Sequence, residues 1–422
     1  MSTLENASKT DEFYLACRNG DVKFVEEYLK TNSDPDRYES SVQSTPLHTA
    51  SRYRRKEIVG LLLNHHCDRS QVDEHGNTAY EVAANDEIRR LYSRPIDPSG
   101  SYRFQDETID GCFDIVKRPK ESVSTPQLSK SKESRTMEGY GTDAEKRLEV
   151  GYATTSISMC QSRLGRFLAD LFQDDTPMSI KTMGNRLQEL IDDEITANND
   201  PQSKKANDLL KKFLYDHDSG RIEYLIRLYT METKFYHALK YNPIPLALPL
   251  YIASRTMKVR HFQGRSYRGA KINDEDIVLY QWAAQNPARL LQTRHFSSTS
   301  IECSVAEKFL TNVSKKNDHS EQKSALFIFN FPQQCDQTIN LSRLSFEHPC
   351  LSEFEDEAEV LILPWTLFQV DSIQQDSSYI ISLTNVLLPH QNMWSSLKWI
   401  LTHLRGSLKR FHEHFPPPVE RF

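Results

Sequence analysis

The chain has 422 residues, which exceeds one ordinary hydrophobic core and predicts two or three structural units. Its formal net charge of −6 excludes a general electrostatic attraction to nucleic acid or anionic lipid. The seven cysteines are widely spread without a CxxC pair, which excludes a disulfide framework. No secretory signal starts the chain and no apolar run approaches the ~20 residues of a membrane span, so we expect a soluble cytoplasmic protein.

The N-terminal part of the sequence repeats itself. Three apolar positions recur 34 residues later (50 − 16 = 34), namely Ala16, Val25 and Leu29 as Ala50, Val59 and Leu63. Residues 45–50, TPLHTA, resemble the TPLHxA signature of ankyrin repeats, whose period is about 33 residues. We therefore expect residues 11–92 to form a small all-α unit of two full ankyrin repeats and a partial third. Because repeats stabilise one another by stacking, an array this short should be marginal or lean on the next domain.

The remainder of the chain changes character three times. Residues 93–145 are rich in Pro, Ser, Thr and Lys and predict a flexible linker. Helical spacing dominates from about 146 to 242, and short segments rich in β-formers follow from about 262, which predicts an α+β domain over 146–388. The tail, 389–422, has the pattern of a basic amphipathic helix. Packing on its own domain is favoured for this helix over a protein partner, and we do not expect membrane contact.

Four short motifs follow one another in the α+β domain: YRG at 267–269, FSSTS at 296–300, EAEVLILP at 357–364 and FQV at 368–370. Together they resemble the arginine-specific mono-ADP-ribosyltransferase family, the Arg-Ser-Glu class, over roughly half the chain. One departure is Trp365 after Pro364, where the family often has a smaller residue, and it bears on the shape of a loop. The resemblance implies an ADP-ribosyltransferase fold, with split mixed β-sheets flanked by N-terminal helices.

The resemblance also implies roles for individual residues. Arg268 would grip the pyrophosphate of NAD, because a guanidinium fork suits two phosphate oxygens. Ser298 would position the nicotinamide ribose and hold Glu359, whose carboxylate would stabilise an oxocarbenium-like ribose. Further NAD-binding positions would be Tyr267, Gly269 and Phe296, although Tyr267 and Phe296 could equally be core residues. No cofactor beyond NAD and no metal is expected, since His65-His66-Cys67 lacks further ligands at a suitable spacing.

Five carboxylates immediately precede the apolar run 360–363. If Glu357 and Glu359 share a strand, their side chains point the same way about 6.6–7 Å apart. Glu359 would then be desolvated, while Glu357 would face solvent, pair with an arginine acceptor and take its proton. The negative charges of Glu353, Glu355 and Asp356 would attract a cationic acceptor, or would simply form a solvated loop.

The leading hypothesis is a transferase that moves ADP-ribose from NAD to arginine side chains of an acceptor protein and releases nicotinamide. The ankyrin segment would choose the target or a protein partner, and no nucleic acid is involved. Two alternatives remain open: an NAD glycohydrolase, and an ankyrin-based interaction protein with an inactive transferase fold. Retention of Arg268, Ser298 and Glu359 argues against the inactive form.

Overall fold

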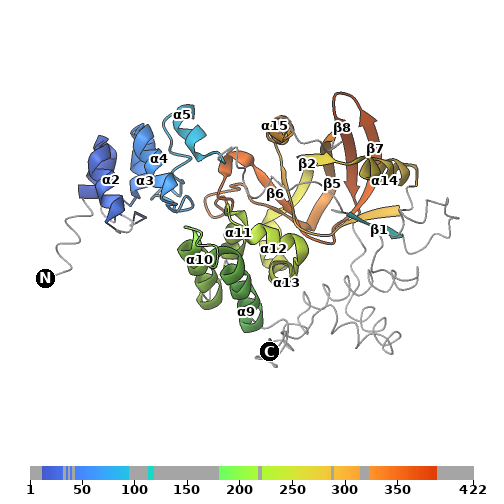
Figure 1. Ribbon diagram of the computed structural model, residues 1–422, viewed down its shortest axis with the longest axis horizontal. Coiled ribbons are helices and arrows are strands. Elements are labelled where there is room, and N and C mark those ends of the chain that lie inside the picture. Colours follow the sequence, from blue (N-terminus) through green and yellow to red (C-terminus); the bar gives the residue numbers. More distant parts are fainter. Residues whose placement is uncertain are drawn as a thin grey trace.

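The computed structural model describes residues 12–31, 35–36, 39, 43–94, 113–117, 180–216, 221–286, 289–313 and 323–386. Small N-terminal helices form one end of the molecule, and a strongly twisted sheet forms the other (Figure 1). A group of longer helices lies beside the sheet and beneath the junction between these two parts. The tail expected at 389–422 and most of the linker expected at 93–145 lie outside the described residues. Within the described ranges, no helix is both long enough and apolar enough to cross a membrane.

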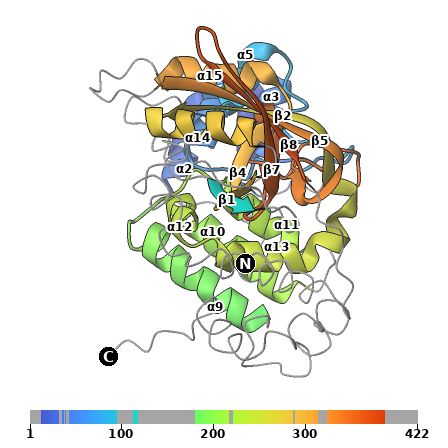
Figure 2. The same cartoon turned by 90° about the vertical axis from the view of Figure 1, so that its right-hand side faces the viewer.

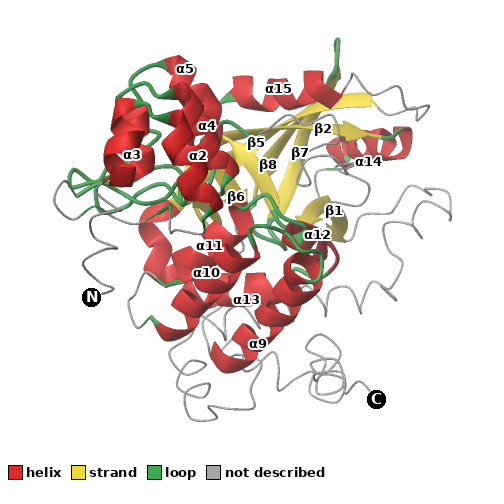
Figure 3. Ribbon diagram, turned by 60° about the vertical axis from the view of Figure 1, so that its left-hand side comes forward, coloured by secondary structure: helices red, strands yellow, loops and turns green. Residues whose placement is uncertain are grey.

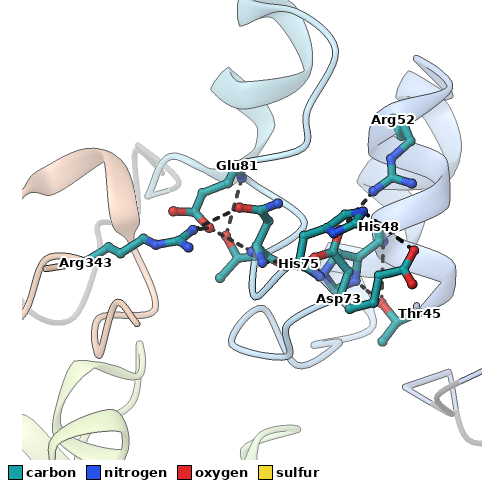
Figure 4. Close-up of polar contacts among 10 residues, drawn as sticks. Thr45, His48, Arg52, Asp73, His75, Glu81 and Arg343 are labelled. Atoms are coloured by element: carbon teal, nitrogen blue, oxygen red, sulfur yellow. Dashed lines mark hydrogen bonds and ion pairs between the residues drawn. The ribbon is translucent and has the colours of Figure 1, made fainter. Parts of the chain in front are cut away.

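The N-terminal unit consists of short helices that stack in chain order. A helical segment at 12–19 is followed by α2 (Val22–Lys30), α3 (Pro46–Arg52), α4 (Lys56–Asn64), α5 (Asp86–Arg89) and the 3₁₀ turn η1 (Arg90–Tyr92). The side chain of Thr45 caps α3 by accepting the N–H of His48, and Pro46 occupies the first turn. The His48 ring lies between the Thr45 hydroxyl, 2.7 Å away, and the carbonyl of Asn77, 3.0 Å away (Figure 4). One histidine therefore joins the second repeat to the start of the third.

The helical layer of the C-terminal part packs against one face of the sheet. Its elements are α9 (Ile180–Ile191), the π-turn η2 (Asp192–Thr196), α10 (Ser203–Tyr215), α11 (Ile222–Thr230), α12 (Phe235–Tyr241), α13 (Ile244–Ala253) and the 3₁₀ segment η3 (Ser254–Arg260). Their apolar faces share one core cluster with Leu361 and Leu363 from the sheet side. The period-3.6 spacing of the sequence is thus used for burial against the sheet.

Within the part of the chain that the structure describes, eight strands form one hydrogen-bonded sheet in the order β1-β3-β7-β8-β5-β2-β4-β6. They are β1 (Phe113–Lys117), β2 (His261–Ile272), β3 (Arg289–Thr293), β4 (Ser297–Ser300), β5 (Lys323–Asn340), β6 (Glu359–Ile362), β7 (Leu367–Gln375) and β8 (Tyr379–Asn385). The β5–β8 pair is parallel and the other pairs are antiparallel, so the sheet is mixed. The expected α+β class is confirmed.

The long strand β5 joins what the sequence analysis expected as split sheets. Its first part pairs with β2 and β8, and its last residues, Thr338 to Asn340, pair with β6. Because β6 also pairs with β4 and β4 with β2, the four strands close into a ring. The two halves of the sheet are therefore continuous through β5.

The opposite face of the sheet is covered by α14 (Asp274–Gln285). The helix α15 (Cys303–Val313) packs against β2 at Gly269 and lies above the strands in Figure 3. Figure 2 shows α14 lying alongside the strands. Aromatic rings belong to the core cluster that α14 shares with the strands. Tyr280 of α14 meets Phe327 of β5 at a centroid distance of 5.5 Å, and Phe329 meets Phe368 of β7 at 5.2 Å. These edge-on contacts add to the free energy gained by burying the rings.

Five residues of the expected linker form a strand instead. Residues 113–117 are β1, which pairs with β3 at the edge of the sheet, and Phe113 is buried. Its ring meets Tyr280 and Phe368 edge-on at 6.2 and 6.3 Å. A pentapeptide with only three apolar residues, FDIVK, gives too weak a local signal to predict a strand, and β3 supplies the hydrogen bonds that stabilise it.

Candidate active site

The three motifs of the proposed site lie on three adjacent strands. Tyr267 of β2 pairs with Ser300 of β4, and Ser300 in turn pairs with Glu359 of β6. Ser298 lies opposite Leu361. Because strand side chains alternate with a period of two, Ser298, Ser300 and Glu359 share one face of the sheet.

Arg268 and Ser298 are in contact. The Nη1 of Arg268 donates a hydrogen bond to the backbone carbonyl of Ser298 at 3.0 Å, and Arg268 is only 6% exposed. The hydroxyls of Ser298 and Tyr229 lie 3.3 Å apart. Tyr229 belongs to α11, so the helical layer reaches the strands at this point. The sequence analysis did not single out Tyr229, because a tyrosine on an amphipathic helix carries no signal beyond burial.

Glu359 is held in a buried position. It is 3% exposed, and its Oε2 accepts a hydrogen bond from the hydroxyl of Ser352 at 3.0 Å. The same Ser352 oxygen accepts the backbone N–H of Phe354 at 3.2 Å. Ser352 is therefore a positioning residue for Glu359, and no local pattern in the sequence distinguishes it from an ordinary loop serine.

The remaining predicted NAD-binding positions differ in their surroundings. Tyr267 is half-buried on β2. Phe296 is buried in the core cluster shared with the helices, 5.2 Å from the ring of Tyr229. Gly269 lies where β2 passes under α15, and an added Cβ would be 2.2 Å from the carbonyl oxygen of Ala306. Gly269 therefore allows a close helix–strand approach behind Arg268.

Replacing Gly269 with alanine is expected to lower the free energy of unfolding by about 1–3 kcal/mol, because the methyl group clashes with helix backbone. Denaturant unfolding measures this loss. Gly60 provides the matched control: it lies inside α4 with no atom within 4 Å of an added Cβ. Gly60→Ala should stabilise by about 0.5–1 kcal/mol. Equal effects of the two substitutions would contradict the close approach.

The relation between the two glutamates differs from the sequence expectation. The strand β6 begins at Glu359, whereas Glu357 ends a 3₁₀ turn, η4 (Glu355–Glu357). Between them Ala358 adopts a left-handed conformation with φ 43° and ψ 52°. Strand alternation therefore does not extend to Glu357, and its expected orientation toward solvent is wrong. Glu357 is buried.

The burial of Glu357 is due to Arg94, which follows the last helical turn of the N-terminal unit. Nε of Arg94 donates to Oε1 of Glu357 at 2.8 Å, and Nη2 donates to Oε2 at 3.0 Å. The third nitrogen, Nη1, pairs with Glu232. This contact spans 263 positions of the sequence, and no local pattern predicts it.

The other carboxylates before β6 also have partners, so the expectation of a solvated loop is wrong, while attraction of a cationic acceptor stays a prediction. Glu353 is buried and forms an ion pair with Lys205 of α10 at 2.8 Å, and Lys205 lies 3.9 Å from Asp68 of the N-terminal unit. Asp356 accepts a hydrogen bond from Ser93 at 2.7 Å. The acidic segment is thus a docking surface for the end of the ankyrin-like unit.

A second contact lies on the loop after β5. Arg343 forms an ion pair with Glu81 and donates to the side-chain oxygen of Asn77 at 3.1 Å, reaching across to the N-terminal unit in Figure 4. Within that unit, Arg52 and Asp73 form another ion pair at 2.9 Å. The short array is therefore in contact with the following domain, as expected from its length.

The docking surface is expected to make stability depend on pH through Glu355. Burial, together with the negative charge of Glu81, raises the pKa of Glu355 to about 7, although a hydrogen bond with Thr78 opposes the shift. Its folded pKa exceeds the unfolded value, so its contribution is fully present below about pH 4.5 and is lost as pH rises through about 7. Glu355→Gln should therefore gain in melting temperature relative to the wild type between about pH 5 and about pH 8.

Taking the difference between variant and wild type cancels the other groups that titrate in this interval. The exposed Glu347, in the loop between β5 and β6, supplies the control substitution Glu347→Gln. A difference that stays constant across this pH range would contradict the assignment to Glu355.

Among the side chains that the structure describes, no group of histidine, cysteine and carboxylate residues is arranged to hold a metal ion.

Comparison with known proteins identifies the N-terminal unit. Residues 13–98 match the family model for ankyrin repeats, in three copies. The unit is an ankyrin-repeat array. The search of curated protein sequences finds no match to this chain.

Several solved structures similar to the chain are ADP-ribosyltransferases. Vis from Vibrio splendidus is 18% identical over 44% of this chain and 84% of that one, with a TM-score of 0.27. HopU1 of Pseudomonas syringae pv. tomato is 12% identical over 42% and 83%, with a TM-score of 0.28. The Clostridium limosum C3 exoenzyme is 12% identical over 44% and 92%, with a TM-score of 0.27. At these scores the similarities do not by themselves assign a fold or an activity to this chain.

Proposed function

We propose that this chain is a mono-ADP-ribosyltransferase that transfers ADP-ribose from NAD to the guanidinium of a protein arginine and releases nicotinamide. The observation that supports the proposal is the adjacency of β2, β4 and β6, the strands that carry Arg268, Ser298 and Glu359. Arg268 contacts the backbone of Ser298, and Ser298 and Glu359 share one face of neighbouring strands. A cation, a hydroxyl and a carboxylate are the groups that NAD cleavage would use.

The first half of the reaction is cleavage of the bond between ribose and nicotinamide. The nicotinamide nitrogen is positively charged in NAD, so nicotinamide leaves as a neutral molecule with the electron pair and needs no proton donor. Positive charge then develops on the ribose, and the carboxylate of Glu359 stabilises it while accepting a hydrogen bond from the 2-hydroxyl. Arg268 neutralises the pyrophosphate, and Ser298 positions the ribose near it.

The second half is attack by the acceptor. A guanidinium nitrogen bonds to the anomeric carbon as the nicotinamide leaves, and the acceptor loses one proton. Glu357, two residues before Glu359, pairs with the guanidinium and takes that proton. The ankyrin-repeat array recognises the acceptor or a regulating protein.

A second candidate is NAD glycohydrolysis, in which water replaces arginine. One observation favours it: both carboxylate oxygens of Glu357 are engaged by Arg94 in this arrangement. Water needs no cation-binding carboxylate, so hydrolysis can proceed with Glu357 occupied.

The test is incubation of the full chain with NAD labelled in its adenine, in the presence of polyarginine or polylysine. Labelled polyarginine, free ADP-ribose and nicotinamide are measured together. We expect nicotinamide release, label on polyarginine and none on polylysine. Free ADP-ribose without labelled polyarginine would identify a glycohydrolase, and the absence of nicotinamide release would overturn both functions.

A further inference from the structure

The guanidinium of Arg94 is enclosed on its edges and on one face. Its Nε and Nη2 bond to the two oxygens of Glu357 at 2.8 and 3.0 Å, and its Nη1 pairs with Glu232. Its central carbon lies 3.8 Å from the ring centroid of Phe354. The side chain of Arg94 is 5% exposed and that of Glu357 is 10% exposed. Two carboxylates and an aromatic ring are the groups that best bind a planar guanidinium.

We propose that Glu357, Glu232 and Phe354 form a guanidinium subsite for the acceptor, and that Arg94 of this chain occupies it in place of an acceptor arginine. The inference rests on the proposed function, in which Glu357 receives the acceptor. It adds Glu232 and Phe354 as residues that select a guanidinium, and it adds an occupant supplied by the ankyrin-repeat array.

Arg94 and an acceptor arginine carry the same guanidinium group, so the two compete directly for the subsite. An acceptor arginine presents the same planar fork to the same two oxygens, and both oxygens are already used. A lysine could not replace this fork, since an ammonium group binds as a point charge. An external arginine can therefore pair with Glu357 only in molecules from which Arg94 has withdrawn. The apparent affinity for the acceptor falls in proportion to that fraction.

Neighbouring contacts keep Arg94 in this position. Ser93 donates to Asp356 at 2.7 Å, one residue from each partner of the ion pair. Arg69 of the array also lies over Phe354, at 5.0 Å, and its Nη1 donates to the carbonyl of Glu353 at 3.5 Å. These contacts hold the array against the subsite, so movement of the array away from the acidic segment uncovers the subsite.

Steady-state kinetics with agmatine, a small free guanidinium compound, tests the competition. Arg94→Ala should lower the KM for agmatine about tenfold or more, and Arg94→Lys should lower it less. Arg343→Ala is the matched control, because it removes another arginine–carboxylate contact of the same interface, with Glu81, away from Glu357. Its KM for agmatine should stay within about twofold of the wild type. An unchanged KM in Arg94→Ala, or an equal fall in Arg343→Ala, would overturn the proposal.

A second measurement does not depend on catalysis. Arg94→Ala removes the guanidinium that pairs with the Glu357 carboxylate. Agmatine should therefore fill the vacated subsite and raise the melting temperature of this variant. At ten times Kd the rise should be about 3 °C, and in Arg94→Ala/Glu232→Gln it should be smaller. Equal shifts in the wild type, Arg343→Ala and Arg94→Ala would refute the subsite even if the chain released no nicotinamide. Nicotinamide release with no selective effect of Arg94→Ala would refute the subsite alone and leave the proposed function intact.

Discussion

Replacement of Glu359 by glutamine is expected to reduce nicotinamide release by about 100- to 1,000-fold or more, with or without an arginine acceptor. The substitution preserves the size of the side chain and its ability to bond to Ser352. It removes the negative charge that stabilises the developing positive ribose. Both transfer and hydrolysis pass through that cleavage, so both should be lost together. Release of nicotinamide from NAD, followed by chromatography, measures the effect.

Two controls separate a chemical from a structural loss. The exposed Glu347, in the loop between β5 and β6, can be changed to glutamine and should retain wild-type nicotinamide release. Ser352→Ala removes the hydroxyl that orients Glu359 and should lower kcat with less effect on KM for NAD. Full transferase activity in Glu359→Gln, with melting unchanged, would refute the role of this carboxylate.

Replacement of Glu357 by glutamine is expected to separate the two halves of the reaction. Transfer to polyarginine should fall by about 100-fold or more, because the acceptor loses its proton acceptor and its ion pair. Hydrolysis of NAD to nicotinamide and free ADP-ribose should remain measurable, since cleavage of NAD depends on Glu359. The same preparation is assayed for labelled polyarginine and for free ADP-ribose, so the ratio of the two products gives the result.

Glu357 also holds Arg94, so its replacement loosens the docking of the ankyrin-repeat array. Asp356→Asn is the matched control, because it weakens the neighbouring contact with Ser93 and leaves Glu357 in place. Transfer by Asp356→Asn should equal or exceed that of the wild type. A fall in transfer as large as that of Glu357→Gln would show that docking, and not proton transfer, limits the reaction.

Local periodicity explains how much of the fold could be predicted. The 34-residue repeat predicted the ankyrin array because each repeat carries its own cap and apolar face, as Thr45 and Pro46 do for α3. The order of helices followed by strands could also be predicted. Apolar residues recur about every 3.6 positions in a helix that packs on a sheet, and every second position in a strand with one buried face. The five residues of β1 escaped prediction, because their stability comes from pairing with β3.

The candidate site was predictable only in part. Arg268, Ser298 and Glu359 stood out by the order of their motifs, and in the structure their strands are neighbours. Ser352 and Tyr229 touch this set but carry no sequence signal. The orientation of Glu357 was misread, because the prediction extended the strand through Ala358, where the backbone is left-handed.

The repeat array, the α+β class and the chain order of the motifs could all be predicted from the amino-acid sequence, since they depend on residues close together in the chain. The position of the acidic segment against the array, and the pairing of Arg94 with Glu357, 263 positions away, became visible only in the three-dimensional structure. The physical reason is that a charge is paired by whatever the fold brings within about 3 Å of it, and a one-dimensional pattern contains no such distance.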